Sequence, residues 1–213
     1  MCGLVGIKSL DGHRTGSLSG SMKSIEHRGP DANGTFSDTG SGVAFGHQRL
    51  SIIDLSDSAN QPMSHPNTES TIVYNGEIYN FQSIRKKLSR LNYFFRTESD
   101  TEIVLLAYEE WGSDCLKKLN GMFSFAIWDQ RRKELFAARD RLGIKPFFYY
   151  YDGDTFAFAS ELQCFKEIDG LDLSIDHSAY YDYFTYYYIP HPKTIYENVK
   201  KLPPAYHLTL TAN

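Results

Sequence analysis

The second residue of the chain brings two reactive groups together. Cys2 follows Met1 and precedes the run Gly3-Leu4-Val5-Gly6-Ile7. Because an initiator methionine ahead of a small residue is normally removed, we expect the mature chain to begin with Cys2. The free α-amine, with an ordinary pKa of about 7.7 to 8, can then take the proton of the thiol, whose ordinary pKa is about 8.5. This combination predicts an N-terminal nucleophile whose own amine activates the sulfur.

The residues behind Cys2 decide whether its thiol can be held in place. The run Leu4-Val5-Gly6-Ile7 is short and apolar, which predicts a buried strand that holds the terminus inside the fold. Chain termini otherwise tend to fray. A cysteine near an N-terminus is most often a small apolar residue without chemistry, so position alone leaves the nucleophile a hypothesis.

The composition is that of a globular protein of one domain. Among 213 residues, 41% are hydrophobic and 23% are charged, and the net charge of -4 argues against a nucleic-acid or anionic-membrane surface. No signal peptide or run of 18 apolar residues is apparent, so we expect a cytoplasmic protein without a membrane partner. The three cysteines, Cys2, Cys115 and Cys164, are too few and too widely spaced for a disulfide framework or a zinc motif. We therefore expect no metal.

Short strands mixed with helices indicate an α+β fold. Ser99 and Glu102 form a capping box ahead of an apolar run, which predicts the start of a helix. Other helices are expected at 18–27, 81–91, 114–119, 160–168 and 177–187. Strands are expected at 43–47, 71–74, 122–128, 134–139, 147–151 and 155–159.

The last part of the chain, 171–213, differs from the rest. Residues 180–188 are unusually aromatic, and prolines interrupt the sequence that follows. The chain ends in a strand-like run, 206–213, with no partner strand after it. We expect this strand to be unpaired and the natural protein to continue beyond it.

Four segments accompany Cys2 and together form a signature. They are His27-Arg28-Gly29-Pro30-Asp31, Gln48-Arg49-Leu50-Ser51-Ile52-Ile53-Asp54, Tyr74-Asn75-Gly76-Glu77-Ile78-Tyr79-Asn80 and Thr97-Glu98-Ser99-Asp100-Thr101-Glu102. With them the chain closely resembles the class II glutamine amidotransferases, which are N-terminal nucleophile hydrolases, and among these the glutaminase domain of glutamine-hydrolysing asparagine synthetases. The segments 140–146 and 200–204 extend the likeness over essentially the whole chain.

The resemblance implies a fold, a domain division and a reaction. The fold is a four-layer αββα sandwich of two antiparallel sheets flanked by helices. Residues 2–170 form the glutaminase domain, and 171–213 lead toward a synthetase domain absent from this chain. The reaction is hydrolysis of L-glutamine to glutamate and ammonia through a Cys2 thioester.

The same resemblance assigns the catalytic groups. Cys2 attacks the carboxamide, while the side chain of Asn75 and the backbone N–H of Gly76 match the family's oxyanion hole. An Asn-Gly pair after a strand is also typical of a hairpin turn. The loop His27-Arg28-Gly29-Pro30-Asp31 matches one near the nucleophile in the family, so we expect it to have a supporting role, with no direct chemistry from His27.

The free amino acid must be recognised through its α-substituents. Arg49 matches the family's clamp for the α-carboxylate, because a planar guanidinium pairs with a carboxylate through two hydrogen bonds. Asp100 matches the acceptor for the α-ammonium, with Glu77 beside it, although a carboxylate there also suits the start of a helix. Ile52 and Ile53 match the pocket wall beside the clamp.

What the chain lacks limits the expected activity. It contains neither a Ser-Gly-Gly-x-Asp-Ser phosphate loop nor a Walker-type motif. We expect no cofactor in this chain, and ATP and Mg only in the synthetase domain, which is either part of the same parent chain or a separate subunit. A homodimer is also compatible with the sequence. Two other functions stay open: a non-hydrolytic partner or scaffold domain, and an amidohydrolase that acts on another amide.

Overall fold

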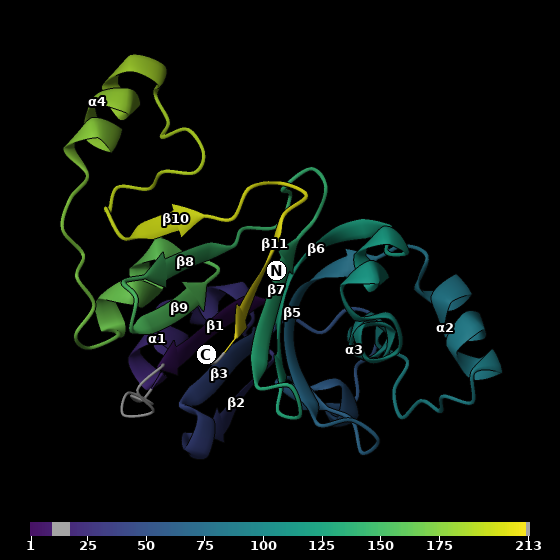
Figure 1. Cartoon of the computed structure of the whole chain (residues 1–213). Helices are drawn as coiled ribbons and strands as arrows, with labels where there is room; N and C mark the ends of the chain where they lie inside the picture. The colour runs from purple at the N-terminus through teal and green to yellow at the C-terminus, as the bar shows by residue number, and fades with distance from the viewer. Residues whose placement is uncertain (10–17, 212–213) are drawn as a thin grey trace.

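The computed structural model describes residues 1–9 and 18–211, and it contains two antiparallel sheets (Figure 1). All six expected strand runs are confirmed, as is the strand behind Cys2. In order across the first sheet, the strands are β10 (Val199–Lys201), β8 (Phe148–Tyr151), β9 (Thr155–Ala159), β1 (Gly3–Ser9), β3 (Val43–Arg49) and β2 (Ala32–Asp38). In order across the second sheet, they are β11 (His207–Thr211), β7 (Glu134–Arg139), β6 (Gly121–Asp129), β5 (Ser70–Ile78) and β4 (Met63–Ser64).

Helices cover the outer face of each sheet. The segments expected at 114–119 and 160–168 form 3-10 turns, and the one at 18–27 divides into a short α-helix and a 3-10 turn. The described part of the chain holds no helix long and apolar enough to cross a membrane. The α-helices are α1 (Ser19–Ser24), α2 (Phe81–Arg90), α3 (Asp100–Trp111) and α4 (His177–Tyr186). The 3-10 turns are η1 (Glu26–Arg28), η2 (Thr39–Ser41), η3 (Asp57–Ala59), η4 (Gly112–Lys117) and η5 (Leu162–Glu167).

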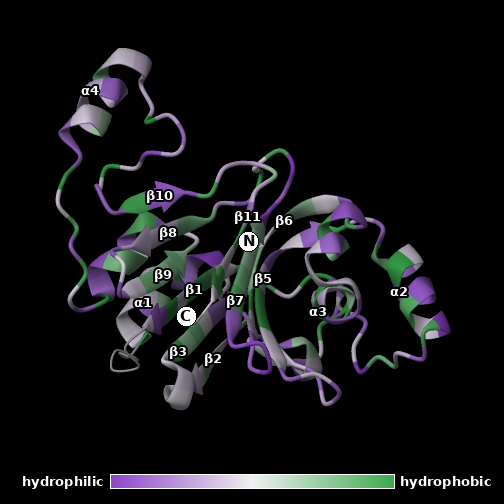
Figure 2. Cartoon of the chain, viewed as in Figure 1, coloured by the Kyte–Doolittle hydropathy of each residue, from purple (hydrophilic) through white to green (hydrophobic). Residues whose placement is uncertain are grey.

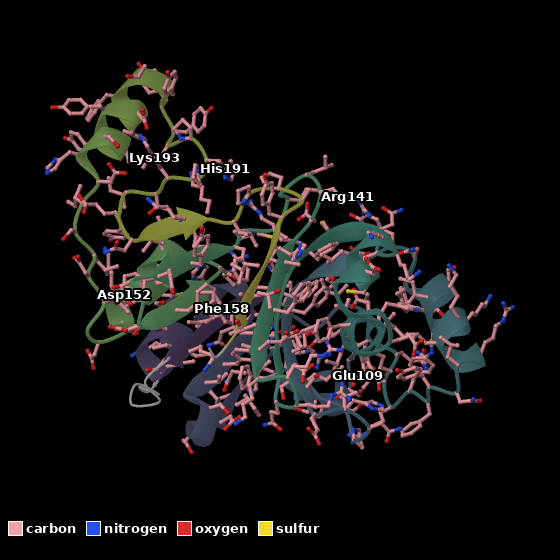
Figure 3. All side chains as sticks on the ribbon, viewed as in Figure 1. Glu109, Arg141, Asp152, Phe158, His191 and Lys193 are labelled. Atoms are coloured by element: carbon pink, nitrogen blue, oxygen red, sulfur yellow. The ribbon has the colours of Figure 1, made fainter. Side chains whose placement is uncertain are left out.

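Alternating side chains divide the core into three apolar layers. Leu4 of β1 packs between the two sheets with Val73 of β5 and Phe158 of β9, which is labelled near the centre of Figure 3. The neighbouring Val5 faces the opposite side, against α1 and η5. Beyond the second sheet, α2 and α3 pack on β5, β6 and β7, and α2 has a hydrophobic and a hydrophilic side (Figure 2). The order helix, sheet, sheet, helix confirms the expected sandwich.

Helix α3 begins where the capping box predicts, but only half of the box forms. The hydroxyl of Ser99 accepts a hydrogen bond from the N–H of Thr101 over 3.2 Å. The second hydrogen bond of the box, from the backbone N–H of Ser99 to the carboxylate of Glu102, does not form. Its carboxylate accepts from the N–H groups of Arg96 and Thr97 over 2.8 and 2.9 Å, and so fixes the approach to the helix.

The final strand has a partner, so the expectation that it is unpaired was wrong. Strand β11 pairs antiparallel with β7, and Leu208 and Leu210 pack on the layer between the sheets. Its pairing partner precedes it in the sequence, which is why no following strand is needed. Residues 212 and 213 of the expected strand lie outside the described residues.

Helix α4 stands away from both sheets in Figure 1. Lys193, labelled with His191 in Figure 3, ties the loop that follows α4 to it through an ion pair of 2.8 Å with Asp182. Several aromatic side chains of this helix are exposed, among them Tyr181 and Phe184. The helix therefore adds little to the core that holds the site.

Candidate active site

A cavity of about 240 Å³ opens where the two sheets meet the start of α3. Its walls come from the residue before β1, the end of β3 with the loop after it, the end of β5, and the first turn of α3. All eight predicted site residues line it: Cys2, Arg49, Ile52, Ile53, Asn75, Gly76, Glu77 and Asp100. The structure thus gathers in one place residues that lie almost a hundred positions apart in the sequence.

The backbone of Leu50 holds the Cys2 thiol. Because β1 and β3 are paired, Cys2 lies beside the chain that leaves β3. The Leu50 N–H donates to Sγ over 3.4 Å, and the thiol lies 3.7 Å from the Leu50 carbonyl oxygen. On the other side, Arg28 Nε donates to the Cys2 carbonyl oxygen over 3.0 Å. The nucleophile candidate is therefore fixed through both its side chain and its backbone.

The loop that carries His27 and Arg28 reaches the terminus through Arg28. Arg28 forms an ion pair of 2.8 Å with Glu161, and the exposed ring of His27 lies 3.1 Å from the same carboxylate. Arg28 thus bonds directly to the Cys2 backbone, while the hydrogen bond of His27 goes to Glu161. The supporting role predicted for the loop 27–31 is thus carried by Arg28, while Glu161 had no predicted role.

Burial raises the pKa of the Cys2 thiol. The hydrogen bond from Leu50 and the positive charges of the chain's amino terminus, Arg49 and Lys145 act in the opposite direction. The raised pKa means that the thiol is protonated at neutral pH. The group needs a base to become a nucleophile.

Asn75 and Gly76 lie inside strand β5, so the alternative of a hairpin turn is wrong. Side chains alternate along a strand, and Asn75 therefore shares the face of Val73, toward the first sheet and Cys2. Its Nδ2 is buried and has no hydrogen-bond partner among the residues that the structure describes. A buried amide without a partner is costly, so this donor is a candidate for binding a ligand.

The N–H of Gly76 also points into the cavity. In the pairing of β5 with β6, Gly76 lies opposite Phe123. The N–H and C=O of Phe123 both bond to Asp140, on the β7 side, so Phe123 does not bond to Gly76. The N–H groups of Tyr74 and Ile78, which point the same way as that of Gly76, are taken by the side chains of Gln61 and Asp100. Gly76 lies between them and its N–H faces the cavity.

Only glycine fits at this position. A Cβ atom on Gly76 would lie 2.4 Å from the carbonyl oxygen of Met122 and 2.8 Å from Cα of Phe123. Both are backbone atoms that cannot move aside cheaply. The close approach of β5 and β6 thus requires the glycine.

The guanidinium of Arg49 is held against the loop that follows β3. Its Nη1 donates to the carbonyl oxygen of Ser56 over 2.9 Å and to Oδ1 of Asn60 over 2.7 Å, and its Nη2 donates to the carbonyl of Asp54. Three of its five N–H donors are therefore used. Within residues 1–9 and 18–211, no hydrogen bond uses the other two.

Asp100 is buried at the first turn of α3 and tied to β5. Its Oδ2 accepts the hydroxyl of Tyr74 over 2.7 Å and the N–H of Ile78 over 2.9 Å. Burial raises the pKa of Asp100, and these hydrogen bonds act against that rise. The carboxylate is thus positioned by two donors from the strand that also carries Asn75 and Gly76.

The other predicted residues form the mouth of the cavity, and its wall also contains residues without a predicted role, among them Tyr74, Lys145 and Gln61. Ile52, Ile53 and Glu77 are exposed at the rim. Tyr74 and Lys145 stand in segments that sequence analysis singled out, but without a role of their own. Gln61 carried no signal at all. Its side chain accepts from the Tyr74 N–H over 2.6 Å and lies 3.3 Å from the Thr101 hydroxyl.

Comparisons with known proteins agree with this geometry. The family model of the glutamine amidotransferase domain matches residues 1–213. The chain is 41% identical over 199 residues to a putative glutamine-hydrolysing asparagine synthetase 2 of Methanocaldococcus jannaschii, covering 84% of this chain and 38% of the relative. It is 39% identical over 190 residues to the glutamine-hydrolysing asparagine synthetase 3 of Bacillus subtilis, covering 88% of this chain and 30% of the relative. The chain thus spans well under half the length of these relatives.

The fold is found in a solved structure at low sequence identity. The structure described as the allosteric regulatory enzyme of purine biosynthesis matches with a TM-score of 0.69 and 18% identity, over 99% of this chain and 47% of that chain. Together with the family match over the whole chain, the cavity around Cys2 identifies the protein's family. The chain belongs to the class II glutamine amidotransferase domains, with the fold of the N-terminal nucleophile hydrolases.

Proposed function

We propose that this chain hydrolyses L-glutamine to glutamate and ammonia through a thioester on Cys2. The observation that carries the proposal is the pair of donors beside the thiol. Asn75 Nδ2 is buried without a partner, and the Gly76 N–H points into the same cavity. Two unused donors close to a nucleophile are what a developing oxyanion needs.

The first half of the reaction begins when Met1 has been removed. The α-amine of Cys2 takes the thiol proton, and Sγ attacks the carboxamide carbon of glutamine. The carbonyl oxygen becomes an oxyanion that accepts hydrogen bonds from Asn75 and Gly76. The C–N bond then breaks, the amine returns its proton to the leaving nitrogen, and ammonia leaves behind a glutamyl thioester.

Water completes the second half. The α-amine takes a proton from a water molecule, which attacks the thioester carbon and again places negative charge between the two donors. The C–S bond breaks, the sulfur recovers a proton and glutamate leaves. Because the α-amine serves as base and acid twice, any residue left attached to Cys2 abolishes the cycle.

We assign recognition of the α-carboxylate and α-ammonium of glutamine to Arg49 and Asp100, in another wall of the cavity than the oxyanion donors. The two unused donors of Arg49 bind the α-carboxylate, and Asp100 Oδ1 accepts the α-ammonium, since Oδ2 is occupied by Tyr74 and Ile78. Glu77 adds negative charge at the rim. Ile52 and Ile53 close over the aliphatic part of the substrate.

The ammonia is proposed to serve a synthetase region outside this chain. The named relatives are glutamine-hydrolysing asparagine synthetases of which the chain spans a minor part, which supports an ATP-dependent acceptor site elsewhere. Hydrolysis itself needs no cofactor in the scheme above, and ATP and Mg belong to that acceptor site. We also propose a cytoplasmic location, which suits the three free cysteines.

The proposal is tested with purified wild-type chain and its Cys2→Ala variant. Intact mass first gives the fraction that lacks Met1, and glutamate release from glutamine is then measured. A glutamine analogue with a chloroketone in place of the carboxamide should add to Cys2 of the processed chain. Release and labelling that both vanish in Cys2→Ala support the proposal.

The opposite results separate the alternatives. A processed chain that neither releases glutamate nor reacts with the analogue contradicts the proposal and favours a non-hydrolytic domain. Labelling without turnover would mean that the site binds glutamine but needs the acceptor region for its rate. Hydrolysis of simple amides in preference to glutamine would favour another amidohydrolase.

A further inference from the structure

Lys145 is a buried cation in the wall of the site, and the scheme above leaves it without a role. It lines the same cavity as Cys2, and its relative exposure is only 6%. Within the described residues no hydrogen bond or ion pair joins its ammonium group to another side chain. The low exposure confines the side chain to the wall of the cavity, where an ammonium group without a protein partner is available to an anionic group in the same cavity.

The backbone around Lys145 is fixed from both sides. Asp140 accepts the N–H of Lys145 over 3.0 Å, and Arg139 Nε donates to its carbonyl oxygen over 2.7 Å. Pro146 follows and further restricts the backbone conformation of Lys145. The side chain therefore starts from a rigid point.

The carboxylates nearby are already occupied. Asp140 accepts four backbone N–H groups, including that of Lys145. Asp100 accepts Tyr74 and Ile78, and Asp54 accepts the N–H groups of Ser56 and Glu98. Glu77 also lines the cavity, but it is exposed to solvent at the rim. Of the acidic groups inside the cavity, the half-buried Cys2 thiol is the one that remains to be balanced.

We propose that the ammonium of Lys145 is the electrostatic partner of the Cys2 thiolate. Its positive charge stabilises the anionic sulfur relative to the neutral thiol, whereas burial in the site favours the neutral thiol. It also assists the α-amine, because a more acidic thiol gives up its proton more readily. Lys145 acts through Cys2, so it is a positioning residue for charge and takes no part in bond making.

Other charged groups also face the thiol and must be held constant in a test. They are the amino terminus, Arg28, Arg49, Glu77 and Asp100, together with the titratable hydroxyl of Tyr74. A single substitution at Lys145 leaves all the others in place. The state of Met1 is measured by intact mass in every sample.

The experiment measures how the alkylation rate of Cys2 by iodoacetamide depends on pH. Wild type is compared with Lys145→Met, which keeps the length of the side chain and removes its charge. We expect the apparent pKa of the thiol to rise by about one unit, and the rate at pH 7 to fall about tenfold. Peptide mass spectrometry isolates the Cys2 signal. Burial raises the pKa of Cys115 to about 12 and that of Cys164 to about 11, so these thiols react little.

Two controls separate charge from stability. Lys8→Met removes another buried lysine, 4% exposed, whose Nζ donates to the Ser41 carbonyl oxygen over 2.8 Å away from the cavity. It should leave the alkylation profile unchanged. Lys145→Arg keeps the charge and should hold the profile near that of wild type. If Lys145→Met does not fold, Lys145→Gln is measured in its place.

An unchanged profile in Lys145→Met, or an equal shift in Lys8→Met, overturns the inference. The catalytic consequence, a lower kcat with little change in KM, rests on the proposed function. The alkylation shift does not, since it is measured without glutamine. A shift in a chain without glutaminase activity would uphold Lys145 and contradict the proposed function alone.

Discussion

The hydroxyl of Tyr74 donates to Asp100 Oδ2 over 2.7 Å, and both side chains are buried. This hydrogen bond joins strand β5 to the start of α3. One partner comes from the strand that carries the oxyanion donors, and the other is the proposed acceptor for the α-ammonium. The two halves of the site, one for the reacting carboxamide and one for the amino acid, are therefore mechanically connected.

Replacing Tyr74 by Phe should weaken glutamine binding and leave the chemical step largely intact. Asp100 loses one donor and its orientation, a loss of about 1 to 2 kcal/mol. We expect KM for glutamine to rise about tenfold while kcat changes little. Steady-state kinetics check this, with the exposed Tyr79→Phe as the control. A fall confined to kcat would contradict the positioning role of Tyr74.

Asn75→Ala should lower kcat and leave KM for glutamine little changed, which is the opposite of the effect expected for Tyr74→Phe. Removing one oxyanion donor typically lowers kcat by about 100- to 1,000-fold. Because Nδ2 has no partner in the described part of the chain, its removal should leave the melting temperature close to that of wild type. Glutamate release and a thermal melt test both points. Loss of stability without loss of kcat would mean that Asn75 is structural.

Arg49→Lys should raise KM for glutamine by about tenfold or more. Lysine retains the charge but cannot hold the carbonyls of Asp54 and Ser56 while also pairing with a carboxylate. The comparison substrate is a glutamine analogue without the α-carboxylate, on which wild type and variant should behave alike. A drop in kcat alone would make the clamp assignment wrong.

The pH profile should have an acidic limb due to Asp100. Burial raises the pKa of this carboxyl above its ordinary value of 3.8. Below that pKa the group is neutral and no longer attracts the α-ammonium, so kcat/KM should fall as the pH falls through it. At higher pH the charged form binds the substrate. In Asp100→Asn the limb should disappear and KM should be high throughout, as measured by initial rates from pH 4 to 8.

His47 should make the fold less stable in acid. Its Nε2 donates to the Tyr74 carbonyl oxygen over 3.0 Å, and burial lowers its pKa from 6.5 to about 4. Between these values the unfolded chain binds a proton that the folded chain excludes, so stability falls as the pH falls. From pH 7.5 to 5 this group contributes a loss of about 2 kcal/mol. Urea titrations should show a smaller loss in His47→Gln, and an equal loss in both proteins would contradict the assignment.

Local patterns predicted the fold where short-range chemistry decides it. The alternation around Leu4, the apolar runs of the central strands and the Ser99 cap are all readable in sequence. Strand β2 was missed because Gly, Asn and Asp weaken its strand propensity, and pairing with β3 overrides that weakness. The partner of β11 is β7, a non-local contact that no local pattern reveals.

For the site, too, the sequence revealed some features and left others hidden. The segments that carry the family resemblance contain the residues that contact glutamine in the proposed function. The resemblance indicated that the loop containing Arg28 supports the nucleophile, but it did not reveal the individual supporting contacts. Those of Gln61 with Tyr74 and of Arg28 with Cys2 arise only when distant segments pack. Asn75-Gly76 is the clearest case: the pair reads as a turn until pairing with β6 places it within a strand.

The amino terminus forms part of the cavity wall, since Met1 lines it together with Cys2. Under the proposed chemistry, an affinity tag fused ahead of Cys2 would both block the base and crowd the substrate. Recombinant chain should therefore carry its tag at the other end. A single aminopeptidase cleavage would then switch each molecule on, and the specific activity of a preparation would report how completely the host had trimmed it.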